Sequence, residues 1–415
     1  MRRLGSSFSG RPVGWPSKCR ARCPINAPSL SRRGWGASVR FVQDERVAPG
    51  VQIPVPIAVT PVPIAVTDER ALGGIWPQGG FRAALRALRP LVGARAIDSA
   101  GTSTPLERMA MAGDPPTVAS CVMLEELGAR AIGMDAVPGV SAFLDGIQRS
   151  RVVGHINGSP IVFATVAAVV RQRIDRRMGT WNEPRVRHRI LASRAHLGEH
   201  QWAALVETNV QPIDLSEGGR TELPGHPLAV RARALEVVAQ ERETIERRLA
   251  AAWCSSESQW LWIDGGVSGN LAVDAASPAF GVIKSHNTLY GNTVALRATL
   301  ALSVGERSPL FLVQHRARRG VASWYLRVHA SDDGDPLHGL VRVEVAPPST
   351  LFRVEDTEQA HPDVMAVHSL SQRANAVSGW ILAERGPLAL PDPRWDTLTY
   401  GVYACEQFLK ALIGA

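Results

Sequence analysis

Two segments far apart in the sequence share a pattern that few folds accommodate: an apolar strand that ends in Asp-Gly. They are SAFLDG at 141–146 and QWLWIDGG at 259–266. An aspartate at the end of a buried strand exposes its carboxylate, and the glycine lets another group approach the backbone closely. Between them, residues 226–253 carry apolar side chains at helical spacing and charges on the opposite face. This order predicts a sheet with a long helix packed on it.

Strand patterns continue after the first of these aspartates. SRVVGHI at 150–156 and SPIVFATVAAVV at 159–170 are joined by Asn157-Gly158, a typical two-residue hairpin turn, so we expect a three-stranded meander over 141–170. Further strands are expected at 279–291, 308–316, 323–330 and 339–346, and helices from about residue 80 and at 117–130, 356–385 and 398–413. Strand groups alternating with helices indicate a mixed α/β fold.

Positive charge is concentrated at the start of the chain. The formal net charge is +8, but the first 43 residues hold nine arginines or lysines and no acid. The remainder has 37 basic and 38 acidic residues, so the overall charge does not indicate a nucleic-acid-binding surface. An acid-free start is typical of a transit peptide or of a start codon assigned too early, and we favour the latter. We expect a disordered tail over 1–75, a helical region over 76–134 and the functional domain over 135–415.

Composition also narrows the location of the protein. Apolar residues make up 45% of the chain, enough for a sizeable core. No apolar run approaches the roughly 20 residues of a membrane span, and the start lacks the apolar stretch of a secretory signal. We therefore expect a cytoplasmic protein without a membrane partner.

A local cluster of arginines follows the predicted meander. Against few acids, such a cluster favours contacts to the phosphates of a nucleic acid, with salt-sensitive and sequence-independent affinity. The alternative, a solvated helix or loop face in an arginine-biased protein, is the simpler interpretation. Our candidates for nucleic-acid binding are Arg171, Arg173, Arg176, Arg177 and Arg187.

Carboxylates are the candidates for chemistry. Hydrolysis of a phosphodiester with a divalent cation needs several carboxylates that converge on one position. Asp145 and Asp264 end the two Asp-Gly strands, and the helix between them offers Glu246, with Glu243 as its competitor. Each signal alone is unspecific, because Asp-Gly is also a common turn and helix glutamates are usually solvated. Their ordered combination favours a shared metal site.

This combination resembles the NurA nuclease family, whose members place an Asp-Gly on the opening strand, a glutamate on a helix and a second Asp-Gly after that helix. The likeness continues through 279–291 and 323–330 to a terminal helix at 392–412, and covers roughly residues 135 to 415. The matching segments are FLDGIQRS (143–150), RETIERRLA (242–250) and WIDGGVSG (262–269).

The resemblance implies an RNase H-like sheet, manganese or magnesium as the cation, DNA as the substrate and a HerA-type hexameric ATPase as the partner in processing DNA ends. We also expect a homodimer. On the matching positions, Asp145, Glu246 and Asp264 would ligate the metal, and Tyr400 matches a late tyrosine of the family. The family usually has a histidine after that tyrosine, whereas this chain has Glu406 there. This departure leaves open a second function, a catalytically inactive subunit that binds DNA or docks the ATPase.

Lys284 is a further candidate for the site. The chain has 43 arginines and three lysines, so a lysine next to the second Asp-Gly strand runs against its own composition. A compact ammonium there is suited to hold a phosphate or to stabilise the charge on a leaving oxygen. A chance lysine at a strand end is the alternative.

Overall fold

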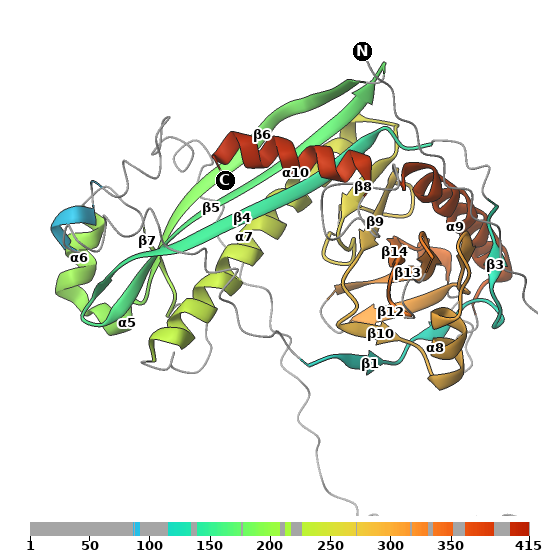
Figure 1. Ribbon diagram of the computed structural model, residues 1–415, viewed down its shortest axis with the longest axis horizontal. Coiled ribbons are helices and arrows are strands. Elements are labelled where there is room, and N and C mark those ends of the chain that lie inside the picture. The colour runs from blue at the N-terminus through green and yellow to red at the C-terminus, as the bar shows by residue number, and fades with distance from the viewer. Residues whose placement is uncertain are drawn as a thin grey trace, which may run out of the picture. The chain divides into compact units, whose positions relative to one another are not determined.

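In the computed structural model the chain divides into Met1–Ile64 and Ala65–Ala415, and all of the described residues belong to the second unit. It has the expected mixed α/β architecture, in which helices flank a large mixed sheet (Figure 1). None of the helices in the described residues combines the length and the apolar character that crossing a membrane requires. The predicted tail over 1–75 lies outside the described residues. These are 86, 88–91, 115–133, 139–175, 177–207, 212–216, 226–270, 272–315, 318–330, 335–351, 362–385 and 399–414.

The sheet contains 12 strands within the described residues. Its main path runs in the order β2-β12-β13-β14-β9-β8-β4-β5-β6-β7, and β11 and β3 extend it beside β13. A separate parallel pair joins β1 to β10. The strands are β1 (Thr117–Ala119), β2 (Val122–Met123), β3 (Arg130–Ala131), β4 (Ala142–Ile156), β5 (Ser159–Ile174), β6 (Arg177–Ala192), β7 (Pro212–Asp214), β8 (Leu261–Asp264), β9 (Ala279–Ile283), β10 (Thr288–Tyr290), β11 (Glu306–Arg307), β12 (Phe311–His315), β13 (Arg318–Arg327) and β14 (Leu340–Val345).

A meander of three long antiparallel strands, β4, β5 and β6, forms one half of the sheet. The predicted turn at Asn157-Gly158 is confirmed, since both residues have the positive φ, 50° and 75°, that a type I′ turn requires. The division of the meander was predicted wrongly. Segments 141–146 and 150–156 form a single strand, β4, and the third strand is β6, within the arginine cluster. Arginines occupy the face of β6 that packs toward α7, where Arg187 and Arg189 pair with Glu241, so the strand lacks the apolar alternation on which the prediction relied.

The five central strands have the RNase H-like arrangement. Edge strand β7 is left out of this comparison. Across the sheet the order is β6, β5, β4, β8 and β9, so the third, second, first, fourth and fifth of these strands in the chain lie side by side. The first three are antiparallel, whereas β8 runs parallel to β4 and β9 runs parallel to β8. The junction between β4 and β8 therefore brings the two Asp-Gly strands together.

Helices cover both faces of this sheet. α7 (Pro227–Ser256) packs on one face through residues such as Val238, Ile245 and Trp253, while α9 (Val364–Glu384) and α10 (Tyr400–Ile413) cover the other (Figure 1). The predicted helix at 226–253 is confirmed, and its start is fixed by His226, whose Nδ1 accepts a hydrogen bond from the Leu228 amide at 3.1 Å. Further helices are α5 (Arg194–Leu197), α6 (Glu199–Glu207), α8 (Thr293–Leu300) and the short 3-10 helix η2 (Ser349–Leu351). Residues 86 and 88–91, in the segment predicted to be helical from about residue 80, are also helical.

The helix predicted at 117–130 is wrong. This segment forms the short strands β1, β2 and β3, which pair with β10, β12 and β11 respectively. Its leucine and glutamate residues favour a helix locally, but partners far along the chain determine its structure. The strand predicted at 279–291 is divided into β9 and β10, and the helices predicted near 356–385 and 398–413 correspond to α9 and α10.

Two helical glycines give a test of the packing on the second face. A Cβ at Gly401 of α10 would stand 2.5 Å from Cδ1 of the buried Phe143 ring and closer still to its outer atoms, whereas a Cβ at Gly379 of α9 would meet Ile132 at 3.9 Å. We expect Gly401→Ala to lower the free energy of unfolding by about 1–3 kcal/mol. Gly379→Ala should raise it by about 0.5–1 kcal/mol through helix propensity. Urea unfolding followed by circular dichroism measures both, and equal effects would contradict the packing described.

Candidate active site

Asp145 and Asp264 lie next to each other at the junction of two parallel strands. The register pairs Phe143 with Trp262 and Leu144 with Ile263, so the aspartates follow at the next position of each strand. Neighbouring strands run about 5 Å apart, and side chains at equivalent positions point to the same face. Phe143 and Trp262 pack on the face covered by α9 and α10, and the aspartates share that face. The sequence prediction that these two carboxylates meet is consistent with this register.

Lys284 lies beside this pair of aspartates, just after the end of β9, the strand that pairs with β8. Val282 of β9 stands opposite Asp264, and the chain continues beyond Ile283 to Lys284. The Lys284 ammonium lies 2.8 Å from Oδ1 of Asp264, and both side chains are largely buried. Lys284 therefore forms a salt bridge with Asp264, and its role in the chemistry stays a prediction.

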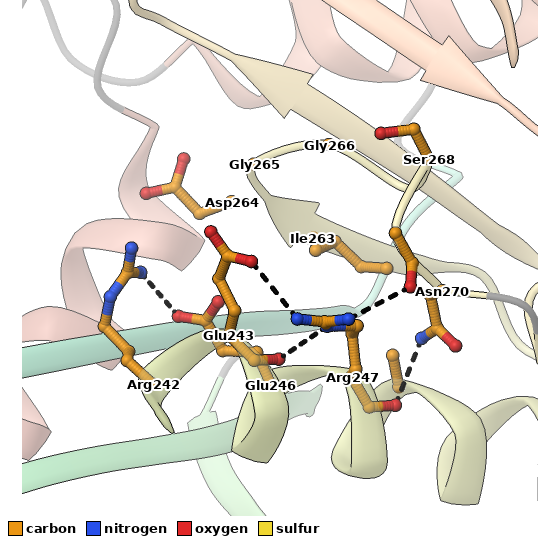
Figure 2. A pocket seen from close by; sticks show the side chains of 12 residues that line it. Arg242, Glu243, Glu246, Arg247, Ile263, Asp264, Gly265, Gly266, Ser268 and Asn270 are labelled. Carbon is orange, nitrogen blue, oxygen red and sulfur yellow. Dashed lines mark hydrogen bonds and ion pairs between the residues drawn. The ribbon is translucent and has the colours of Figure 1, made fainter. Parts of the chain in front are cut away.

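Glu246 reaches the same junction from the opposite face of the sheet. It projects from α7 toward Gly146, where a Cβ would stand 3.0 Å from Cγ of Glu246 and closer still to Oε1. The absent side chain of Gly146 thus forms a notch that receives the glutamate. Because β8 ends at Asp264, Glu246 and Asp264 line one cavity of about 160 Å³ (Figure 2). Asp145 and Asp264 therefore project from one face of the sheet, and Glu246 approaches from the other.

The fourth carboxylate of the site belongs to Glu406 of α10. Its charge contributes to raising the pKa of Asp145. The preceding residue, Cys405, is buried, and its thiol donates to the Phe143 carbonyl at 3.4 Å. Burial and the Asp145 carboxylate raise the pKa of that thiol. We refer to Asp145, Glu246, Asp264 and Glu406 as the carboxylate cluster.

Electrostatics make the carboxylate cluster costly in its ionised form. The pKa of Asp145 is raised well above its usual value, mainly by burial and then by the charges of Asp264, Glu246 and Glu406, while Lys284 partly offsets the effect. Burial also raises the pKa of Glu246 to about 7, against the lowering influence of Arg242. Proteins concentrate such unfavourable negative charge chiefly at functional sites.

The loop after Asp264 is shaped by glycines and by a buried acid. Gly281 of β9 lies against the backbone of Gly265 and Gly266, where any Cβ would collide with main-chain atoms. Glu344 of β14, with 2% of its side chain exposed, accepts a hydrogen bond from the Val267 amide at 3.0 Å and pairs with Arg342 at 2.5 Å. Sequence reasoning missed Glu344, although an acid inside the apolar strand GLVRVEVA is a usable signal.

Glu243 and Tyr400 occupy different positions from the cluster. Glu243 lines the cavity, but 43% of its side chain is exposed and it pairs with Arg247 at 3.2 Å (Figure 2). Glu246, buried in the notch, is therefore the better candidate of the two. Tyr400 begins α10 and is about half exposed, and its charge contributes to raising the pKa of Arg173. The structure does not bring this tyrosine together with the carboxylates.

The arginine candidates are largely engaged inside the protein. Arg173 makes two hydrogen bonds to Glu384 of α9, at 2.6 and 2.7 Å, and Arg187 contacts Glu241 of α7 at 2.9 Å. Arg171 donates to the Met178 carbonyl and stacks over Phe408. Arg177 is exposed at the start of β6, and Arg176 lies outside the described residues. Phosphate binding by this group stays a prediction.

The cluster has the chemistry of a site for a hard divalent cation. Its donors are carboxylate oxygens, the ligands that Mg²⁺ and Mn²⁺ prefer. Across the described residues, no set of three His, Cys, Asp or Glu side chains is already arranged around one metal position. Instead, three of the four acids pair with cations of the protein: Asp264 with Lys284, Glu246 with Arg242 and Glu406 with Lys410. The carboxylate oxygens of the cluster and its surplus of negative charge fit a divalent cation.

The fold and the site together define the structural class of the protein. It is an RNase H-like mixed sheet with a carboxylate cluster at the junction of its first and fourth core strands, completed by helices on both faces. A scan against models of protein families and a search of curated proteins each found no match to the chain.

Proposed function

We propose that this protein is a divalent-cation-dependent nuclease of the NurA type, which hydrolyses phosphodiester bonds of DNA at the carboxylate cluster. The observation that carries the proposal is the parallel register that brings Asp145 beside Asp264. The raised pKa of Asp145, caused by burial and by three other carboxylates, supports it further. DNA as the substrate, a HerA-type ATPase as the partner and a homodimer are proposed from the sequence resemblance alone.

The residues of the site would have different roles in catalysis. Bound Mg²⁺ or Mn²⁺ supplies a Lewis acid that neutralises the phosphate and activates water. Asp145 and Asp264 would hold the cation between adjacent strand ends, and Glu246 would reach it through the notch at Gly146. Lys284 would exchange Asp264 for a phosphate oxygen, where a compact ammonium stabilises negative charge.

Cleavage of labelled single-stranded or nicked DNA by the purified full-length chain tests the proposal. We expect products with manganese and complete loss of cleavage with EDTA, because carboxylates without a cation repel the phosphate. Persistent cleavage in EDTA would contradict the mechanism. Salt-dependent DNA binding without cleavage under any divalent cation would instead select the catalytically inactive subunit.

The rate of cleavage is expected to rise with pH through about 7. Glu246 must be ionised to bind a cation, and burial raises its pKa to about 7, so protonation removes this ligand at lower pH. Since proton and cation compete, raising the manganese concentration should shift the midpoint of the profile to lower pH. A rate profile between pH 5.5 and 8.5, measured at two manganese concentrations, checks both effects. A midpoint independent of the manganese concentration would contradict the role of Glu246.

A further inference from the structure

Arg242 occupies the position from which it can respond to a cation in the cluster. It lies one helical turn before Glu246 on α7, and its Nη1 donates to Oε1 of that glutamate at 2.7 Å. Its Nε donates to Oε1 of Gln148, on β4, at 3.1 Å. About a quarter of the side chain is exposed, 28%, and it lines the same cavity as Asp264 (Figure 2).

The Arg242 guanidinium and a divalent cation would compete for the carboxylate of Glu246. The oxygen that accepts from Arg242 belongs to the carboxylate that would face the metal, and two positive groups on one carboxylate repel each other. A cation bound by Glu246 would therefore weaken the bond between this carboxylate and the guanidinium and favour release of the guanidinium. The displaced group remains next to Gln148, within the cavity that contains Asp264. A planar guanidinium released beside a cation finds its best partner in a phosphate, which accepts parallel hydrogen bonds.

We propose that Arg242 is a phosphate-binding residue whose contact with the nucleic acid is switched on by the divalent cation. Without the cation it neutralises Glu246, and with the cation it moves to a phosphate oxygen of the bound strand. This inference rests on the proposed function, and it adds a residue that couples occupation of the cation site to affinity for the substrate.

Other arginines of the same helix provide controls. Arg247 also lines the cavity, but it pairs with Glu243, outside the cluster, at 3.2 Å. Arg233 forms a similar pair with Glu236 at 2.9 Å, far along α7 from the cavity. A pair that does not involve a cluster carboxylate has no reason to respond to the cation.

The experiment measures DNA binding with and without a divalent cation. Wild type, Arg242→Gln and Arg233→Gln are titrated against a short fluorescein-labelled single-stranded DNA with phosphorothioate linkages, which keep the charge and resist cleavage. Each titration is done in EDTA and in Ca²⁺, a hard cation with the same preference for oxygen ligands. We expect Ca²⁺ to strengthen binding by wild type about tenfold and binding by Arg242→Gln by about twofold or less. Arg233→Gln should behave as wild type.

The salt dependence gives a second measure. In Ca²⁺, Arg242→Gln should lower the slope of log Kd against log salt by about 0.7, the loss of one phosphate contact on a single strand, whereas in EDTA the slope should be unchanged. Equal weakening in both conditions would overturn the switch, since Arg242 would then be a permanent phosphate contact. No effect in either condition would overturn it as well.

Failure of the inference is distinguishable from failure of the proposed function. If wild type cleaves DNA with manganese and responds to Ca²⁺, but Arg242→Gln shows the same gain from Ca²⁺, the inference alone is wrong. If wild type neither cleaves DNA nor responds to Ca²⁺, both the cation site and the inference fall.

Discussion

Replacing Asp145 or Asp264 with asparagine is expected to reduce manganese-dependent cleavage by about a thousandfold or more, because each change removes one anionic ligand of the cation. The two variants should nevertheless have opposite effects on stability. Asp145 is buried with a pKa well above its usual value, whereas Asp264 is partly exposed and paired with Lys284 at 2.8 Å. This difference separates a loss of function from a loss of folding.

The direction of the stability change in Asp145→Asn follows from the raised pKa of Asp145. A carboxyl group with a higher pKa in the folded state contributes full stability below its unfolded pKa and loses that contribution as the pH rises through the folded value. At neutral pH the group therefore costs stability. Asparagine stays neutral and keeps the Oδ1 that accepts from the Gly146 amide at 2.8 Å. Asp145→Asn should raise the free energy of unfolding at pH 8, with a smaller gain at pH 4.

For Asp264→Asn the expected change is a decrease of about 1 kcal/mol or less, the value of a partly exposed ion pair. Urea unfolding at the two pH values, together with the cleavage assay, measures both variants. Asp363→Asn is the matched control, because asparagine caps α9 as well as aspartate does and the residue lies outside the cluster. Unchanged cleavage in either cluster variant would remove the proposed mechanism.

Gly146→Ala is expected to slow cleavage by about a hundredfold. The new methyl group would fill the notch that holds Glu246, with a Cβ 2.9 Å from Cδ of that glutamate. The glutamate must then move by about 1 Å, a displacement that typically costs this much in rate. Cleavage under single-turnover conditions with saturating manganese measures the effect.

A control glycine and a compensating change make this prediction specific. Gly179→Ala, also on a strand of the meander, places its Cβ 3.8 Å from the nearest atom, the Gln172 carbonyl oxygen, and should leave the rate unchanged. Adding Glu246→Asp to Gly146→Ala shortens the displaced side chain and should restore part of the lost rate. Equal rates for Gly146→Ala and wild type would show that Glu246 does not contribute.

Local sequence signals predicted the parts of the fold that are determined locally. The hairpin turn at Asn157-Gly158 and the long helix α7 follow from turn chemistry and from helical spacing. The segment at 117–130 has the composition of a helix, yet pairing with β10, β11 and β12 makes it three short strands. Strand β6 was missed because its arginines pair with α7, and such pairing follows from tertiary structure.

The sequence was sufficient to predict which residues form the candidate site, but not how their side chains are arranged. Strand ends marked by Asp-Gly identified Asp145 and Asp264, and the unusual lysine identified Lys284. The sequence contains no sign that Glu246 approaches through a notch from the opposite face, because this depends on where β8 ends. The position of Tyr400 away from the cluster likewise depends on how α10 lies on β4.

The outer edge of β6 has a consequence for solubility. Among the described residues, β7 pairs with β6 at Ile190–Ala192, and most of the strand before it is an outer edge. Pro184 lacks an amide hydrogen, Asn182 has a φ of 51°, and a bulge interrupts the pairing beside Val170. Such features, together with charged side chains, prevent open strands from recruiting other chains into aggregates. We therefore expect Pro184, Asn182 and the bulge to oppose the pairing of this edge with a strand of another molecule.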